Sequence, residues 1–276
     1  MSAPESAWLD VAPWGITPRV AERLRATALE VAREWGVPLG ERIAAGRFSY
    51  VAFAGDDAVL KVVPVEDDEA DQEADALALL QGDGAVRLLR HDRARRAMLI
   101  ERARPGGDAS ALPEPEAIRV AVAAAKRFWR PLARGSAFRW IGDHVPRWLE
   151  HAGDHELVRH AKELYASLRP SDATLVHGDF HHHNLLRHGD GWVVIDPKPM
   201  LGEPEFDVPT FLWNPIGHQP TKESVGRWIG AFAHAGLDAE RLRKWAIVRG
   251  VYQSLPLSPD LTEETSPQLR VVRALL

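Results

Sequence analysis

The residues with the clearest chemical potential lie in one polar segment, His177–Asn184, which reads His-Gly-Asp-Phe-His-His-His-Asn. Its aspartate, Asp179, could accept a proton from an attacking hydroxyl group. Its asparagine, Asn184, follows five residues later and offers an amide oxygen of the kind that Mg²⁺ accepts as a ligand. A base and a metal ligand at the two ends of one short loop would suit a reaction in which a hydroxyl attacks a metal-bound phosphate.

The order His-x-Asp-x-x-x-x-Asn fits the catalytic loop of protein kinases, where the aspartate acts on the attacking hydroxyl and the asparagine binds magnesium. A second carboxylate, Asp196, follows the expected strand that ends at Ile195. We expect Asp196 to be the second magnesium ligand, since carboxylate and amide oxygens suit this ion. Taken singly, a His-Gly-Asp or an Asp-Pro sequence is more typical of a turn with local hydrogen bonds. The kinase interpretation depends on their joint occurrence in one order.

A lysine stands within an apolar run, Val59-Leu60-Lys61-Val62-Val63. Strand alternation places Val59, Lys61 and Val63 on one face. Lys61 could simply face solvent, or it could point into a cleft, held there by a carboxylate. The acidic segment that follows offers three partners for it, namely Glu66, Glu69 and Glu73.

Three successive histidines, His181–His183, allow two interpretations. Histidine is a common ligand of transition metals. Adjacent loop residues rarely point at one ion, so we favour a role in the loop and at the rim of the substrate site. His182 is our candidate there.

The elements that must position these residues are predicted from hydrophobic periodicity. Residues 19–35 predict a helix that Gly36-Val37-Pro38 ends, and 48–54 with 58–64 predict a β-hairpin. We expect an acidic helix over 67–81, strands over 86–89 and 97–100, and a break over 101–107 that we treat as a hinge. Three helical stretches follow, over 115–128, 157–168 and 221–252, and a β-loop-β unit has its strands at 174–176 and 192–195.

Together these elements predict an α+β, bilobal, protein-kinase-like fold. Residues 1–102 would form a small N-terminal nucleotide-binding lobe with an antiparallel sheet and a helix. Residues 103–276 would form a larger, mainly helical lobe for catalysis and substrate binding. A ligand is expected in the cleft between the lobes.

The composition is that of an ordinary globular protein of 276 residues, with 45% hydrophobic and 26% charged residues. The absence of cysteine excludes disulfides, thiol nucleophiles and cysteine-ligated metals. The formal charge of −5 argues against a nucleic-acid partner. No apolar run is long enough to span a membrane, and the first residues do not form a secretory signal, so we expect a cytoplasmic protein without a membrane or protein partner.

The motifs together resemble the aminoglycoside phosphotransferase family, a branch of the protein-kinase-like fold. The likeness is greatest to streptomycin 6-phosphotransferases and to aminoglycoside/hydroxyurea resistance kinases. It extends over residues 45–215. The segments that carry it are 177–184, 195–198, 202–203, 206–207 and 214–215 in the C-terminal half, and 59–61, 73–77, 86–89 and 99–103 in the N-terminal half.

The resemblance implies a role for several residues. Lys61 would contact the α- and β-phosphates of ATP and pair with Glu73, and Ser49 would lie in the loop over the phosphates. Backbone groups of Glu101 and Ala103 would bind adenine. Asp179 would be the catalytic base, with Asn184 and Asp196 as Mg²⁺ ligands. The Phe-Gly that follows the metal-binding aspartate in regulated kinases is replaced by Pro197-Lys198, so we expect no activation-loop control.

The expected acceptor is a small molecule with a hydroxyl group, specifically an aminocyclitol antibiotic similar to streptomycin. Candidate acceptor-binding residues are His182, Lys198, Glu203, Asp207 and Trp213. Asp207 could equally be structural and brace the catalytic loop. Two departures from the resembled subfamily, His183 and Pro199 at positions where glycine is common, bear on how the acceptor is held. The alternatives are a metabolic kinase that acts on a sugar or an amino alcohol, and a non-catalytic protein that binds a nucleotide or a metal.

Overall fold

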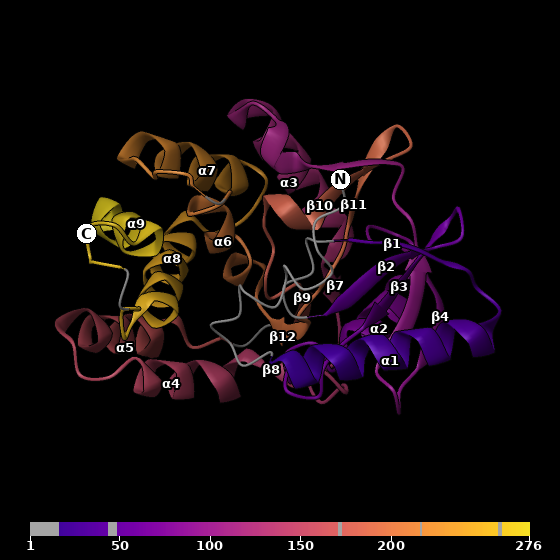
Figure 1. The fold of residues 1–276 in the computed structure, drawn as a ribbon. Coiled ribbons are helices and arrows are strands. Elements are labelled where there is room, and N and C mark those ends of the chain that lie inside the picture. The colour runs from indigo at the N-terminus through magenta and orange to yellow at the C-terminus, as the bar shows by residue number, and fades with distance from the viewer. Residues whose placement is uncertain (1–16, 44–48, 171–172, 216, 259–260) are drawn as a thin grey trace. The chain divides into compact units, whose positions relative to one another are not determined.

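The computed structural model describes residues 17–43, 49–170, 173–215, 217–258 and 261–276. The chain divides into two compact units, Met1–Gly106 and Gly107–Leu276. Within each unit the architecture is the expected α+β one, with an antiparallel sheet in the first and mostly helices in the second (Figure 1). The nucleotide-binding and catalytic roles that we expect for residues 1–102 and 103–276 stay predictions.

The first unit is built on one antiparallel sheet with the spatial order β1-β2-β3-β5-β4. Its strands are Leu39–Arg42 (β1), Tyr50–Ala54 (β2), Ala58–Val62 (β3), Leu88–Asp92 (β4) and Ala97–Glu101 (β5). The predicted hairpin is confirmed as β2 and β3, although Phe48, its expected first residue, lies outside the described residues. Every residue of β3 is buried, because this strand has a neighbour on each side. Lys61 therefore lies in the middle of the sheet.

Two helices accompany this sheet. The first, α1 (Pro18–Trp35), is the predicted one: Thr17 caps its start, and Gly36 ends it in the left-handed conformation, with φ 69°. Its apolar face packs on β2 and β3 and completes the core of the unit. The predicted acidic helix over residues 67–81 is too long, since α2 covers only Glu73–Leu80 and the residues before it form turns. Five of the six residues over 67–72 are acidic or polar, so this segment lacks an apolar face that packing could stabilise.

The second unit contains two small sheets that frame the polar loop. One has the order β11-β10-β6, with β10 at Leu185–His188, β11 at Gly191–Val194 and β6 at Pro105–Asp108. The division between the units falls within β6, where we expected a hinge without regular structure. The other sheet has the order β7-β9-β12-β8, formed by Arg130–Pro131 (β7), Thr174–Val176 (β9), Met200–Gly202 (β12) and Arg139–Trp140 (β8). The loop 177–184 therefore runs from one sheet to the other.

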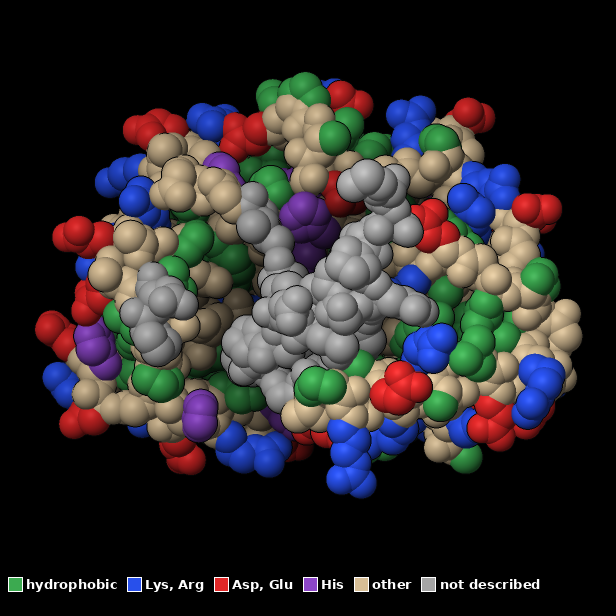
Figure 2. Space-filling view, viewed as in Figure 1, with side chains coloured by type: hydrophobic (Ala, Val, Ile, Leu, Met, Phe, Trp, Pro, Cys, Tyr) green, Lys and Arg blue, Asp and Glu red, His purple; other side chains and the backbone are tan. Residues whose placement is uncertain are grey.

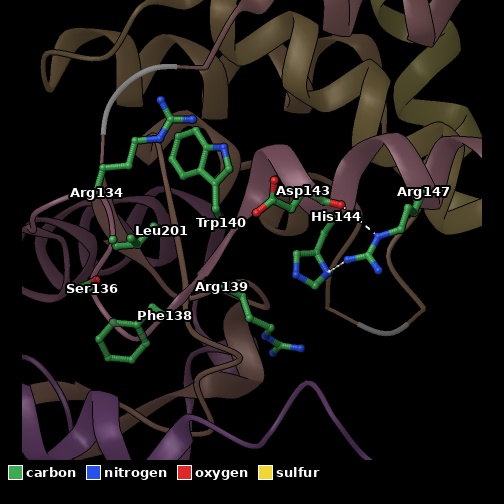
Figure 3. Close-up of a pocket in the computed structure, with 10 residues that line it drawn as sticks. Arg134, Ser136, Phe138, Arg139, Trp140, Asp143, His144, Arg147 and Leu201 are labelled. Carbon is green, nitrogen blue, oxygen red and sulfur yellow. Dashed lines mark hydrogen bonds between the residues drawn. The ribbon is translucent and has the colours of Figure 1, made fainter.

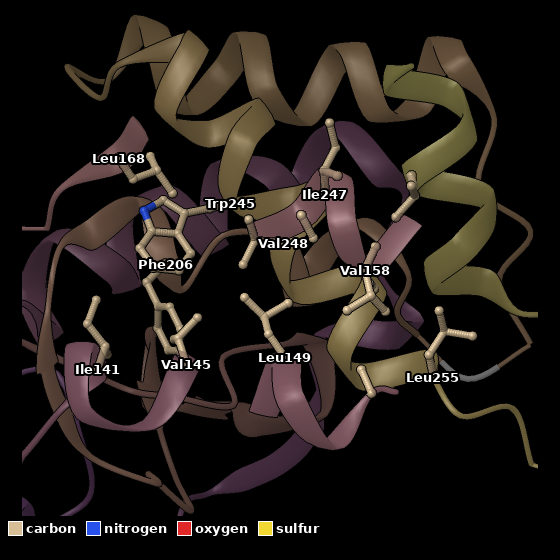
Figure 4. Close-up of a cluster of buried hydrophobic side chains, with 14 of the residues drawn as sticks. Ile141, Val145, Leu149, Val158, Leu168, Phe206, Trp245, Ile247, Val248 and Leu255 are labelled. Carbon is tan, nitrogen blue, oxygen red and sulfur yellow. The ribbon is translucent and has the colours of Figure 1, made fainter. Parts of the chain in front are cut away.

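The helices of this unit gather around α8 (Ala239–Ser254), which contacts α4, α5, α6, α7 and α9. Their bounds are Glu114–Phe128 (α3), Ile141–His151 (α4), Glu156–Leu168 (α5), Pro209–Leu212 (α6), Lys222–His234 (α7) and Pro267–Leu275 (α9). The core between α4, α5 and α8 is apolar, and Trp245 lies fully buried against the edge of Phe206 (Figure 4). This core supports the segment 203–207, which follows β12.

Helices α3 and α5 confirm the predicted ones, whereas α4 and α9 were not anticipated. Pro146 lies inside α4 and disguised it, because proline usually ends a helical pattern. Among the described residues, no helix has the length and apolar character needed to cross a membrane. On the face drawn in Figure 2, Lys and Arg side chains are interspersed with Asp and Glu side chains.

Candidate active site

One carboxylate, that of Asp207, holds the loop that follows β9. Its Oδ2 accepts the N–H of His177 at 2.7 Å and its Oδ1 accepts the N–H of Gly178 at 2.8 Å. The indole Nε1–H of Trp129 donates to Oδ2 as well, at 2.9 Å. Asp207 is completely buried, so these three donors take the place of water around its charge. This arrangement fixes the direction in which the chain enters Asp179.

His177 is a buried, neutral spacer within the loop. Its Nδ1 accepts the N–H of Asp179 at 3.2 Å, so the proton resides on Nε2, which lies 3.0 Å from the carbonyl oxygen of Ile195. Burial lowers the pKa of His177 below its ordinary value. The ring therefore ties the loop to the end of β11 without adding a charge.

Asp179 presents its carboxylate at the surface of the second unit. Its side chain is 44% exposed, more than that of any residue that braces the loop. Its Oδ2 lies 3.5 Å from Nε2 of His181. Burial alone would raise the pKa of Asp179, but the contact with His181 and the positive charge of Arg249 outweigh it and hold the pKa below its ordinary value. At neutral pH the group is an exposed carboxylate that can orient a hydroxyl and accept its proton.

Asn184 and Asp196 are brought together by the β10–β11 hairpin. Its pairing of Leu185 with Val194 continues in the hydrogen bond from the N–H of Ile195 to the carbonyl oxygen of Asn184, at 3.0 Å. The Nδ2 of Asn184 donates to the carbonyl oxygen of Asp179 at 2.8 Å, which assigns the amide orientation and leaves Oδ1 as the oxygen that could bind a metal ion. Asp196 adopts a left-handed backbone, with φ 55°.

This pair of oxygen donors fits Mg²⁺, which binds one or two protein groups and completes its shell with water and phosphate oxygens. Within the described part of the chain, no group of three or more His, Cys, Asp and Glu side chains is arranged to hold a metal. These residues therefore do not form a metal site that depends on protein ligands alone, such as a histidine-rich transition-metal site at His181–His183.

In the first unit, Lys61 and Glu73 form the expected ion pair, with 2.6 Å between Nζ and Oε2. The side chains are 8% and 0% exposed, respectively, so solvent scarcely screens the pair. The pair joins β3 to the first residue of α2, which explains why Glu73, rather than Glu66 or Glu69, is the partner: Glu66 pairs instead with Arg23. Contact between Lys61 and phosphate stays a prediction.

The other expected nucleotide contacts are placed as follows. Ser49 is buried directly before β2, while its neighbours Gly46, Arg47 and Phe48 lie outside the described residues. The N–H of Glu101 donates to the carbonyl oxygen of Arg87 at 2.9 Å, so that donor is not the one adenine would use. Ala103 follows the end of β5, and no described residue accepts its N–H.

The three histidines have different surroundings. His181 faces Asp179, and His183 Nδ1 lies 2.9 Å from Oδ2 of Asp108 at the end of β6. His182 is buried against the rings of Phe211 and Trp228, and burial lowers its pKa to about 3. Our candidate for the substrate rim, His182, is thus a core residue, and the histidines that border the loop surface are His181 and His183.

The predicted acceptor role of Glu203 is also corrected, and of the two roles left open for Asp207 the structural one is found. Asp207 has its oxygens filled by loop donors, and Glu203 is 2% exposed and engaged by the guanidinium of Arg241, with 2.6 Å between Arg241 Nε and Glu203 Oε2. Both carboxylates are structural, because neither can reach an acceptor without losing its partners. Trp213 is buried as well, whereas Lys198 is partly exposed and donates its N–H to the carbonyl oxygen of His177 at 2.8 Å.

Three bracing residues were missed from the sequence: Trp129, Thr210 and Arg249. The Thr210 hydroxyl donates to the carbonyl oxygen of Phe180. Arg249 is 2% exposed and donates to the carbonyl oxygens of Phe206 and Gly178, at 2.6 and 2.7 Å. A signal for Arg249 existed, since it stands in the apolar run Ile247-Val248-Arg249-Gly250-Val251, as Lys61 does in its strand.

The chain is similar to several known proteins. A family described as aminoglycoside/hydroxyurea antibiotic resistance kinase matches residues 41–256. A streptomycin 3''-kinase of Klebsiella pneumoniae is 31% identical over 69% of this chain and 76% of its own length. A hydroxyurea phosphotransferase of Kitasatospora aureofaciens is 32% identical over 87% of this chain and 73% of its own length. Among solved structures, an aminoglycoside phosphotransferase APH(4)-Ia in complex with ADP and hygromycin B shares the fold, with a TM-score of 0.58, 17% identity and coverage of 90% and 97% of the two chains.

Proposed function

Since the chain belongs to the aminoglycoside/hydroxyurea antibiotic resistance kinase family, we propose that it transfers the γ-phosphate of ATP to a hydroxyl group of a streptomycin-like aminocyclitol antibiotic. The observation that carries the proposal is the exposed, ionised Asp179, held by a loop whose backbone is fixed on Asp207. An exposed carboxylate with a lowered pKa on a rigid loop serves to orient a hydroxyl and take its proton, which is what phosphoryl transfer requires of the protein.

In this proposal Asp179 accepts a hydrogen bond from the acceptor hydroxyl and then its proton as the new O–P bond forms. Asn184 Oδ1 and the Asp196 carboxylate would hold Mg²⁺, which would supply positive charge to neutralise the transferring phosphate. Lys61, kept in place by Glu73, contacts the α- and β-phosphates of ATP as a compact positive charge. Catalysis then comes from positioning and electrostatics, without a covalent enzyme intermediate.

The acceptor class is supported by the name of one relative, a streptomycin kinase, whereas the name of the other, a hydroxyurea phosphotransferase, gives a small hydroxyl compound of another class. Because ATP is the phosphate donor, we also propose that the protein acts in the cytoplasm. Since the chain carries the proposed base and the proposed metal ligands, we do not favour a non-catalytic role.

The proposal is tested by measuring ADP formation with streptomycin, spectinomycin, hygromycin B, hydroxyurea and choline as acceptors. We expect streptomycin to give the highest kcat/KM, and mass spectrometry to show the addition of one phosphate to it. Stimulation by choline alone would instead identify a metabolic kinase. Binding of ATP without ADP formation with any of the five compounds would contradict the proposed antibiotic-modifying activity.

A further inference from the structure

A second concave site lies in the larger unit, apart from the residues of the catalytic loop. It is a pocket of about 470 Å³ formed by the segment before β8, by β8 itself and by the first turns of α4 (Figure 3). Its ten lining residues include three arginines, Arg134, Arg139 and Arg147, but only one carboxylate, that of Asp143. The volume is that of a small-molecule site, and the lining carries a net positive charge.

Two of the three arginines, Arg134 and Arg147, are not part of surface ion pairs with described residues. The guanidinium of Arg134 lies over the ring of Trp140, 4.4 Å from its centre. Arg147 Nε donates to the backbone carbonyl of Asp143 at 2.9 Å, and its Nη2 lies 3.4 Å from Nδ1 of His144. Over the described parts of the chain, neither Arg134 nor Arg147 pairs with a carboxylate. Their charges therefore remain for a ligand, while Arg139 adds a third positive charge to the lining.

Figure 3 shows Ser136 on one side of the pocket with Leu201, and Arg147 with His144 on the other. The lining therefore combines polar and apolar side chains with the arginines.

The sheet places this pocket near the catalytic loop. In β12, Met200 pairs with Arg139 of β8 on one side and with Val176 of β9 on the other. The segment that enters β8 thus lies at the end of the sheet where the chain leaves β9 toward Asp179. Two strand spacings of about 4.8 Å separate β8 from β9.

We propose that this pocket binds a small molecule that carries an oxyanion group, a phosphate or a carboxylate. Arg134 and Arg147 attract the oxyanion, and the ring of Trp140 forms a flat wall beside the carbon skeleton. Guanidinium groups suit both oxyanions, since they offer several N–H donors in one plane. A guanidinium- or ammonium-bearing antibiotic would be repelled here, so this site is distinct in chemistry from the acceptor site proposed above, and it does not depend on that proposal.

The test is calorimetric titration of the full chain, with ADP present at saturation so that any nucleotide site is filled. The probes are glucose 6-phosphate, glucuronate and glucose, which share a sugar ring and differ in the group at one end. We expect saturable binding of glucose 6-phosphate, of glucuronate or of both, and none of glucose. The anion that binds more tightly identifies the oxyanion as phosphate or carboxylate.

Two variants, Arg134→Gln and Arg147→Gln, should each weaken the binding of that anion about tenfold, because each removes one charge from the lining. Both residues are exposed, so their unfolding temperatures should stay near that of the parent protein. Arg159→Gln removes an equal charge from α5, outside the pocket, and should leave the affinity unchanged. Failure of both anions to bind, equal binding of glucose, or an affinity that survives the combined Arg134 and Arg147 changes would overturn the proposal.

Discussion

The two oxygens of Asp207 accept the backbone N–H groups of His177 and Gly178, at 2.7 and 2.8 Å, so one buried carboxylate sets the course of the chain into Asp179. Arg249 holds the next peptide group, between Gly178 and Asp179, by donating to the carbonyl oxygen of Gly178. The base that we propose is thus positioned by residues that cannot touch the substrate. This relationship makes Asp207 a positioning residue.

Asp207→Asn should leave the chain folded but slow the reaction. The new amide would direct an NH₂ group at a backbone N–H, so one hydrogen bond is lost and a donor faces a donor, at a cost of about 1–3 kcal/mol in the free energy of unfolding. A shift of Asp179 by a fraction of an ångström should lower kcat about 100-fold. The KM for ATP should change little. Steady-state kinetics and urea unfolding measure these effects, with Asp190→Asn in the exposed β10–β11 turn as control. A large rise in the KM for the antibiotic at unchanged kcat would show instead that Asp207 binds the acceptor.

Gly178→Ala should be much more damaging than another glycine change with the same backbone requirement. Gly178 has φ 83°, and an added Cβ would lie 2.2 Å from the backbone carbonyl oxygen of Lys198. Gly189 has φ 55° with open space around its Cβ position, so Gly189→Ala isolates the backbone cost, about 1–2 kcal/mol. Gly178→Ala should cost at least about 2 kcal/mol more, since the obstacle is backbone that cannot rotate away. Thermal unfolding of both variants measures the difference, and equal losses would contradict the close approach of the two segments.

Two variants separate the effect of the Lys61–Glu73 pair on stability from its effect on catalysis. Lys61→Met takes the lysine charge away from the buried carboxylate of Glu73 and should reduce the free energy of unfolding by about 3–5 kcal/mol. The double change Lys61→Met with Glu73→Leu removes both charges and should recover most of that loss. Neither variant should form ADP at a measurable rate, because the proposed phosphate contact is gone. An active double variant would show that Lys61 serves the fold alone.

Stability should fall with acidity through His182. Burial holds the pKa of folded His182 at about 3, below its ordinary value of 6.5. Between these pH values the unfolded chain binds a proton that the folded chain does not, so stability decreases as pH falls from 6.5 toward 3. His182→Leu should flatten this dependence, measured as urea unfolding at several pH values. His234→Asn, on the exposed end of α7, is the control. A pH dependence that His182→Leu does not alter would mean that His182 is charged or exposed in the folded state.

Much of the fold could be predicted because apolar periodicity is a local property of the chain. Helix α1, with its cap at Thr17 and its end at Gly36, and the β2–β3 hairpin each follow from a few adjacent residues. The same method extended α2 too far and missed α4, since charged turns and an internal proline disguise what packing against the rest of a unit decides. Strands as short as β7 and β8 carry no pattern of their own.

The candidate site, like the fold, could be predicted only in part. Motif spacing predicted Asp179, Asn184 and Asp196 as neighbours, and the hairpin register brings the last two together. It cannot distinguish a carboxylate that faces a ligand from one that is buried with partners, which is why it predicts Glu203 as an acceptor ligand and leaves two roles open for Asp207. That distinction depends on donors far away in sequence, such as Arg241 and Trp129.

The role of Asp179 as the base is tested most directly by the transfer of ³²P from labelled ATP to streptomycin by the parent protein and by Asp179→Ala, with ATP affinity measured on both. We expect the parent protein to label streptomycin in a Mg²⁺-dependent reaction. We expect Asp179→Ala to bind ATP with nearly unchanged affinity and to label streptomycin at least about 1000-fold more slowly, since a base and its positioning are both lost. Labelling by Asp179→Ala at the parental rate would contradict the assignment of Asp179 as the base.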